Sequence, residues 1–138
     1  MQMEAQNEQE REIWEFLDRH LTSIFNGDWA TYQETTADDL SLYEYWIVPH
    51  RQDGLAFHQF MIENRWTGTP QSQRYDLFEK RCQLYGDTAV VTYTFMLSQI
   101  VDGVLSHHTH NESRVIVKRN GRWQVVHVHK SPAEKLSR

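Results

Sequence analysis

The chain has 138 residues, a length typical of one domain, and it can bury a sizeable core without disulfides or a structural metal. Hydrophobic residues make up 39% and aromatic residues 12%, which excludes a disordered or fibrous protein. The formal net charge is −5, so nucleic acid and anionic membranes are unfavourable partners. The single cysteine excludes a disulfide framework, and no apolar run suits a membrane span or a signal peptide. The protein is therefore predicted to be soluble and cytoplasmic.

The N-terminal part of the chain shows the periodicity of an amphipathic helix. Residues 1–9 are polar and have no apolar repeat, so we predict a flexible N-terminus there. From Glu10 onward, apolar residues recur every three or four positions, which predicts a helix of about four turns. This helix is expected to end at Asn26-Gly27, because glycine readily adopts the left-handed conformation that follows a helix.

Two shorter helices and one strand are predicted next. Asp28 is a suitable cap for a short second helix. A β-rich run over residues 40–48 stops at Pro49, because proline has no amide N–H for a neighbouring strand. Asp53 is a plausible cap for a third helix, which runs toward Trp66.

The second half of the chain alternates with a period of two, which is the spacing of β-strands. Turn sequences divide it, and Asn120-Gly121 is the strongest hairpin signal among them. The predicted strands are 73–85, 88–101, 106–119 and 122–130. A single α+β domain is therefore predicted over residues 10–132, with a short tail at 133–138.

The last predicted hairpin also bears on assembly. A two-residue turn at Asn120-Gly121 pairs Ile116 with Val125 and puts apolar side chains on both faces of the hairpin. Helices can cover only one face of such a sheet, so the other face would leave a large apolar patch in water. This pattern predicts a homodimer formed through the sheet.

Histidine is the conspicuous chemical feature, with eight in the chain and five in two short clusters. Alternate residues share a strand face, so His108 and His110 could meet His127 and His129 around a metal ion. No carboxylate accompanies them at a spacing typical of a β-barrel metal site, so ordinary hydrogen-bonded histidines are favoured. No metal and no other cofactor is predicted.

A second cluster on the last hairpin combines acidic and basic groups. The simple register places Arg114 across from His127, and Glu112 across from His129, at about 5 Å. One interpretation is a buried salt-bridge network. The other is a cavity in which Arg114 binds an anion and a histidine exchanges protons. Spacing alone favours the structural interpretation.

Proton-abstraction chemistry would need a carboxylate whose pKa is raised by an apolar environment. Asp38, Asp39 and Glu44 are possible candidates, and each is equally compatible with an exposed position. His58 lies among aromatic residues of the third predicted helix, where a lone histidine is usually a hydrogen-bonded core residue. Nucleophile-elbow, phosphate-loop and dinucleotide motifs are absent, and no catalytic residue is assigned.

Short motifs between Glu10 and Pro132 carry a resemblance to a known family. They are Asn26-Gly27-Asp28, Phe57-His58-Gln59-Phe60, Glu63-Asn64-Arg65-Trp66, Glu112-Ser113-Arg114-Val115, and Gly121-Arg122-Trp123 with the following Val126-His127-Val128-His129. In this order they resemble the association (hub) domain of calcium/calmodulin-dependent protein kinase II, within the nuclear transport factor 2-like and SnoaL-like superfamily.

The resemblance implies a cone-shaped (cystatin-like) domain, in which a strongly curved antiparallel sheet wraps around about three N-terminal helices. It also implies self-association into a homodimer or a larger ring through the sheet. The likeness takes up nearly the whole chain, so we expect a stand-alone relative without kinase activity or calmodulin binding.

The resemblance further implies a pocket for a small carboxylate or similar anion. Arg114 matches a pocket arginine, His58 the pocket histidine, and Trp66 a tryptophan at the pocket mouth. Lys130 stands where another arginine is expected, and a third arginine near Phe95 is absent. The predicted ligand-binding residues are Arg114, His58, Trp66, Lys130, His127 and Glu112. Arg114 and Lys130 can line one pocket only if a bulge shifts a strand.

Three functions are compatible with these observations. The favoured one is a non-catalytic, self-assembling module with a ligand pocket. The alternative is a cofactor-independent isomerase or lyase of the SnoaL or ketosteroid isomerase type that uses the same pocket. A buried Asp or Glu beside His58 would strengthen that alternative. A regulatory subunit for another protein is the third, and no specific feature of the sequence supports it.

Overall fold

The computed structural model describes residues 2–64 and 72–133, which form helices followed by a long-stranded sheet. The helices are α1 (Gln2–Phe25), α2 (Trp29–Glu34) and α3 (Ala56–Glu63). The strands are β1 (Thr36–Glu44), β2 (Gln52–Asp53), β3 (Gln73–Tyr85), β4 (Thr88–Val101), β5 (Val104–Arg119) and β6 (Arg122–Pro132). No helix in these described ranges is both long and apolar enough to cross a membrane.

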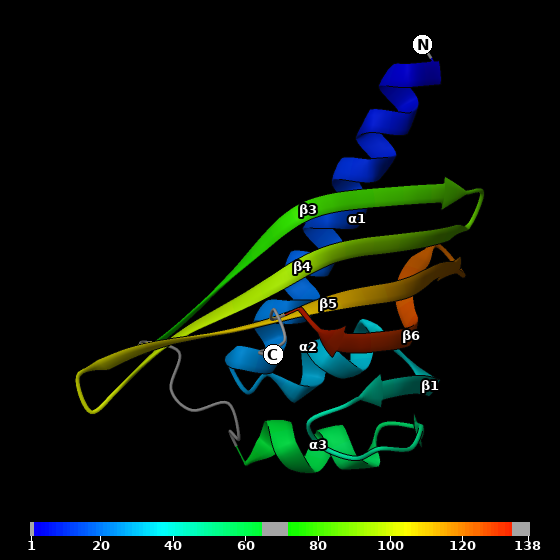
Figure 1. The fold of residues 1–138 in the computed structure, drawn as a ribbon. Coiled ribbons are helices and arrows are strands. Elements are labelled where there is room, and N and C mark those ends of the chain that lie inside the picture. The colour runs from blue at the N-terminus through cyan, green and yellow to red at the C-terminus, as the bar shows by residue number, and fades with distance from the viewer. Residues whose placement is uncertain (1, 65–71, 134–138) are drawn as a thin grey trace.

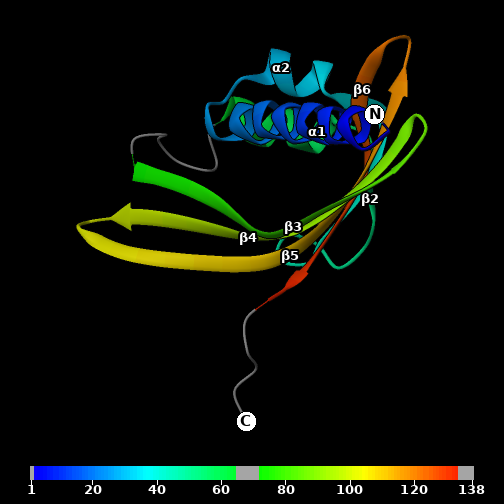
Figure 2. The same ribbon diagram turned by 90° about the horizontal axis from the view of Figure 1, so that it is seen from above.

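The sheet has the strand order β2-β1-β6-β5-β4-β3 and is strongly curved (Figure 1). The helices pack into its concave side, as the view from above shows (Figure 2). The predicted α+β cone is therefore confirmed. One pairing departs from the predicted antiparallel sheet, because β1 runs parallel to β6. β1 follows α2 directly, and it lies beside β6, the last strand of the chain, with both strands running in the same direction.

Most predicted elements are confirmed. The first two strands of the meander have the predicted bounds, and the hairpin turn at Asn120-Gly121 joins β5 to β6. Asp28 caps α2, where its carboxylate accepts the Thr31 N–H at 3.1 Å and the Thr31 hydroxyl at 2.7 Å. Local side-chain chemistry therefore decided these boundaries.

Several boundaries differ from the prediction, including the start of β5 at Val104 and the end of β6 at Pro132. Helix α1 begins at Gln2, before the apolar repeat, because Glu, Gln and Ala favour a helix without needing apolar contacts. The first strand covers Thr36–Glu44 rather than 40–48. Asp53 does not cap α3: it lies in β2 and pairs with Arg51 at 2.9 Å. The residue before α3 is Leu55, which makes no side-chain cap.

A β-bulge in β6 corrects the register of the last hairpin. Ile116 still pairs with Val125 as predicted, but Val115 pairs with His127, so Val126 is an extra residue. Every later residue of β6 is therefore displaced by one position and points to the opposite face. Glu112 lies across from Lys130, not from His129, which is the shift that Arg114 and Lys130 need to share a pocket.

The hydrophobic core lies between α1 and the concave face of the sheet. Ile13, Leu17 and Leu21 form one apolar stripe of the helix and are almost fully buried. Ile116 and Val125 meet this stripe from the sheet and have no exposed surface. Leu21, Phe95 and Val128 belong to this core and also line a cavity, so the cavity lies directly beside the core.

Candidate functional site

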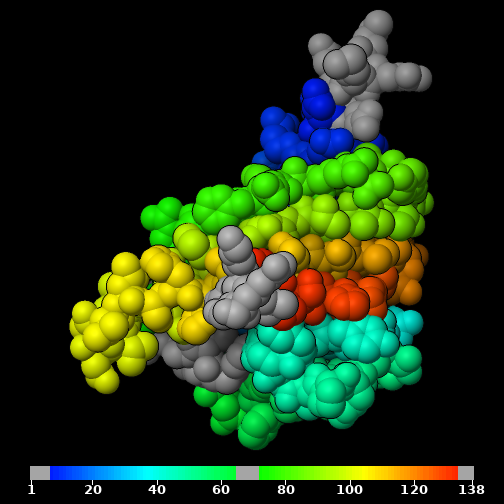
Figure 3. Space-filling model, in the orientation of Figure 1, coloured from blue at the N-terminus to red at the C-terminus, as the bar shows by residue number. Residues whose placement is uncertain are grey.

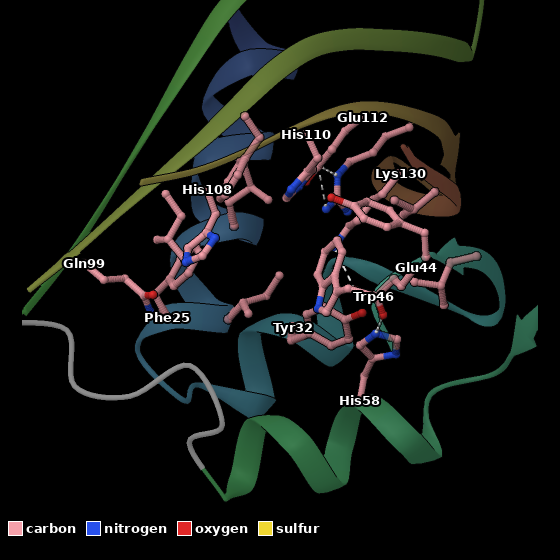
Figure 4. A pocket seen from close by; sticks show the side chains of 18 residues that line it. Phe25, Tyr32, Glu44, Trp46, His58, Gln99, His108, His110, Glu112 and Lys130 are labelled. Atoms are coloured by element: carbon pink, nitrogen blue, oxygen red, sulfur yellow. Dashed lines mark hydrogen bonds and ion pairs between the residues drawn. The ribbon is translucent and has the colours of Figure 1, made fainter. Parts of the chain in front are cut away.

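A cavity of about 420 Å³ lies inside the cone, between α1, α3 and the concave face of the sheet (Figure 4). Its walls are apolar on one side, where Phe25 of α1 and Phe95 of β4 contribute aromatic rings. The opposite side is polar and is formed by residues of β1, α3, β5 and β6. The polar residues Glu44, His58, His110, Glu112, Arg114 and Lys130 line this side.

Arg114 lies at the centre of the buried polar network. Its Nη2 forms an ion pair with Glu112 Oε1 at 3.1 Å, and its Nε donates to the Tyr93 hydroxyl at 2.8 Å. The Tyr93 hydroxyl in turn donates to Glu112 Oε1. Burial opposes the charges of Glu112 and Arg114, but their mutual attraction outweighs it, so the pKa of Glu112 is lowered and that of Arg114 raised. Both groups are therefore charged.

His20 of α1 completes the contacts of this guanidinium. Arg114 Nη1 donates to His20 Nε2 at 3.1 Å, and His20 Nδ1 donates to the Thr35 hydroxyl at 2.7 Å. Burial, with the neighbouring Arg114 charge, holds the pKa of His20 well below its usual value. His20 is therefore a neutral acceptor that ties the helix to the site.

A second buried ion pair joins β1 to β6. Glu44 is 1% exposed, and its carboxylate accepts from Lys130 Nζ at 2.9 Å and from His58 Nε2 at 2.7 Å. Burial raises the pKa of Glu44, but the Lys130 charge and the His58 hydrogen bond outweigh it and lower the pKa to about 2. Glu44 is therefore a carboxylate at any pH near neutrality.

Two aromatic rings lie beside His110 on β5. Its ring stacks on Phe95 at 4.9 Å between centroids and lies 5.0 Å from the tilted ring of Trp46. Its Nε2 hydrogen-bonds to Glu112 Oε2. Lys130 Nζ lies 4.9 Å from the Trp46 ring centre, a cation–π contact that fixes this tryptophan beside the cavity.

The structure brings together four of the six predicted ligand-binding residues: Arg114, Glu112, Lys130 and His58 all line the cavity. His127 does not. The bulge turns it to the convex face, where its Nδ1 lies 2.8 Å from the Ser41 hydroxyl. Trp66 lies outside the described residues.

The four histidines considered as metal ligands are also separated. His108 and His110 line the cavity. His127 and His129 pair with Ser41 and Tyr43 of β1, which alternate with the inward-facing residues of that strand. Within residues 2–64 and 72–133, no group of three or more potential ligands is placed to hold a metal ion.

Sequence reasoning missed several residues of the site. His20 occupies a position of the apolar stripe of α1, three residues after Leu17, and this spacing was a usable signal for burial. Glu44 was considered only as one possible base, although it alternates with Leu42 on the buried face of β1. Tyr93 and Trp46 gave no such signal, because their roles depend on neighbours distant in sequence.

Comparisons with known proteins identify the family and agree with the fold. A family model described as "Calcium/calmodulin dependent protein kinase II association domain" matches residues 9–134. The calcium/calmodulin-dependent protein kinase type II alpha chain of Drosophila melanogaster is 28% identical over 129 residues. That match covers 92% of this chain and 24% of the kinase chain, so this chain spans about a quarter of that relative's length.

Solved structures give the same result. The association domain of the Caenorhabditis elegans kinase is 25% identical, with a TM-score of 0.84, and the match covers 92% of this chain and 98% of that domain. A nuclear transport factor 2-like protein from Salmonella enterica is 23% identical, with a TM-score of 0.70 and 92% of both chains covered. The second likeness concerns the fold alone.

Proposed function

Because the chain belongs to the calcium/calmodulin-dependent protein kinase II association domain family, we propose that it is a self-assembling module whose cone holds a small-ligand pocket. The observation that carries the assembly part is the convex face of the sheet. The described helices lie on the concave side, and Figure 3 views the strands from the other side. The described helices leave this sheet surface uncovered, and we propose that a second copy binds there.

The convex face has a composition suited to such a contact. Val90 pairs with Val115 at its centre, and Tyr43 and Phe78 extend the apolar surface with 37% and 48% of their area exposed. Thr and Ser side chains lie between them, as in interfaces that mix apolar and polar groups. A two-fold contact would bury the same patch of both copies.

Light scattering coupled to size-exclusion chromatography tests the assembly. One chain has a mass of 16.5 kDa. At micromolar concentration we expect a mass of at least twice this value. A monomer mass under these conditions would overturn the proposal.

The ligand pocket is the second part of the proposal. The predicted small carboxylate beside Arg114, with His58 and Lys130 assisting, stays a prediction, and its physical argument changes. Arg114 does not need an external anion, because Glu112 balances its charge inside the protein. Three of its five N–H groups are engaged by described residues, which leaves two for a ligand.

The alternative, an isomerase or lyase of the SnoaL or ketosteroid isomerase type, needs a proton acceptor in the cavity. Glu44 has the position required of such an acceptor, because it is a buried carboxylate beside His58. Its pKa of about 2 makes it a weak base near neutral pH, because little driving force remains for taking a proton from carbon. This favours the binding module over an enzyme that uses Glu44 as its base.

A further inference from the structure

The charges that line the cavity neutralise one another. Arg114 is paired with Glu112, and Lys130 is paired with Glu44, at nitrogen–oxygen distances of 3.1 and 2.9 Å. The two carboxylates are ionised, as the lowered pKa values of both indicate. An anionic ligand would approach two buried carboxylates together with the two cations, so the paired charges provide no net attraction for it. A neutral ligand would meet no such repulsion.

His110 offers a fixed hydrogen-bonding group in the same cavity. A carboxylate oxygen can only accept, so the imidazole donates its Nε2–H to Glu112 Oε2. In the neutral tautomer that this bond selects, the lone pair of the ring is on Nδ1. No residue in the described part of the chain hydrogen-bonds to this atom. The hydrogen bond to Glu112 and the stacking on Phe95 orient the ring, so Nδ1 has a defined position before any ligand binds.

The shape and the walls of the cavity favour a flat apolar body. Phe25 and Phe95 stack nearly parallel in the cavity wall, with an interplanar angle of 13°, and Trp46 also lines the cavity. Leucine and isoleucine side chains of α1 complete the apolar wall. A volume of about 420 Å³ is within the usual range of small-molecule sites and exceeds what a ligand of a few atoms fills.

We propose that this cavity binds a neutral, planar aromatic molecule that carries an O–H or N–H donor, and that His110 Nδ1 accepts this donor. The inference rests on the proposed function, because it names the ligand class of the same pocket. Phenols and indoles are the simplest members of this class. Lys130 and Arg114 then serve mainly to hold Glu44 and Glu112 in their charged, oriented state.

Three probes of similar size and shape separate the possible ligand chemistries. They are 2-naphthol, which is neutral and carries a donor; 2-methoxynaphthalene, which lacks the donor; and 2-naphthoate, which carries an anion instead. Calorimetric titration into the full chain at pH 7.5 gives the three affinities. We expect 2-naphthol to bind at least tenfold more tightly than either of the other two probes.

A pair of variants connects this preference to one side chain. The substitution His110→Phe keeps an aromatic ring beside Phe95 and Trp46 but removes the acceptor, so 2-naphthol should lose its tenfold advantage over 2-methoxynaphthalene. His107→Phe is the matched control, because His107 is exposed and lies on the opposite face of the same strand. It should retain the wild-type preference. Far-UV circular dichroism and the melting temperature identify any variant that fails to fold.

The outcomes separate this inference from the proposed function. Tighter binding of 2-naphthoate would overturn the neutral-ligand inference and leave the ligand pocket supported. Equal binding of 2-naphthol and 2-methoxynaphthalene by the wild type would also overturn it, and this measurement needs no variant. Binding of none of the probes would overturn the inference but not the predicted small-carboxylate site, because all three probes carry a naphthalene ring. Assembly is measured separately, by light scattering.

Discussion

Glu44 and Glu112 illustrate what single residues do in this cone. Each is buried, and each forms an ion pair with a cation from β5 or β6. Buried pairs of this kind add little net stability relative to apolar residues, but they are costly to break on one side, because the remaining charge has no partner. In this protein the two carboxylates orient two histidines, since Glu44 also hydrogen-bonds to His58 and Glu112 also hydrogen-bonds to His110.

The substitution Glu44→Gln should lower the free energy of unfolding by about 3 kcal/mol, because it leaves the Lys130 ammonium without its counter-charge. Urea denaturation followed by circular dichroism measures this change. Asp53→Asn is the matched control: it removes a carboxylate from an exposed pair with Arg51 and should leave stability nearly unchanged. Equal effects of the two substitutions would contradict the interpretation of a buried pair.

The stability that Glu44 contributes should decrease as the pH is lowered. Glu44 has a lowered pKa of about 2 in the folded protein, against an ordinary value of 4.5, so the unfolded chain binds its proton first. The stability it contributes, about 3 kcal/mol, is present in full above about pH 5 and is lost as pH falls toward 2. Urea denaturation between pH 6 and 3 should show a stability difference between wild type and Glu44→Gln that shrinks with acid. A constant difference would show that Glu44 is not responsible.

At this scale the sequence predicted the residues that carry recognisable motifs and missed those that depend on long-range contacts. Arg114, Glu112 and His58 were predicted, because each lies in a conspicuous local motif. Tyr93 was missed, since an aromatic residue alternating along a strand has no feature that distinguishes a hydrogen-bonding role. His127 was wrongly placed, because alternation along β6 does not hold across an extra residue.

The elements themselves were largely predictable. Period-two alternation and the turn at Asn120-Gly121 gave the meander, since these signals are local. The parallel pairing of β1 with β6 was not predicted, because the sequence of neither strand carries a signal that identifies a partner so far away in the chain. The position of the bulge at Val126 was likewise unpredictable, although sharing of one pocket by Arg114 and Lys130 required that some bulge exist.

The cap of α2 is a testable element boundary. The substitution Asp28→Ala removes the acceptor for the Thr31 N–H and should cost about 1 kcal/mol of stability. Urea denaturation midpoints measure the loss. Asp39→Ala, at an exposed position of β1, should stay within about 0.5 kcal/mol of wild type. A loss at Asp39 as large as that at Asp28 would mean that capping is not the cause.

The described part of the molecule has two unlike sides: the concave side of the sheet holds the helices and the cavity, and no described helix covers the convex side (Figures 2 and 3). The substitution Val115→Glu places a charge at the centre of the convex side and should shift the light-scattering mass toward 16.5 kDa. Phe60→Glu is the control, because Phe60 is 65% exposed on α3, a helix of the concave side. The proposed interface would be refuted by a folded Val115→Glu protein that keeps the wild-type mass.

The parallel contact between β1 and β6 also constrains the order of folding. Glu44 and Lys130 are 86 positions apart in sequence, whereas β3, β4, β5 and β6 are joined by tight turns. Closing so long a loop has a high entropic cost, so the meander can form well before β1 joins it. Since β1 supplies one wall of the cavity, the cavity is complete only after β1 has paired with β6. A chain that has folded only as far as the meander would therefore have most of its sheet and no complete cavity.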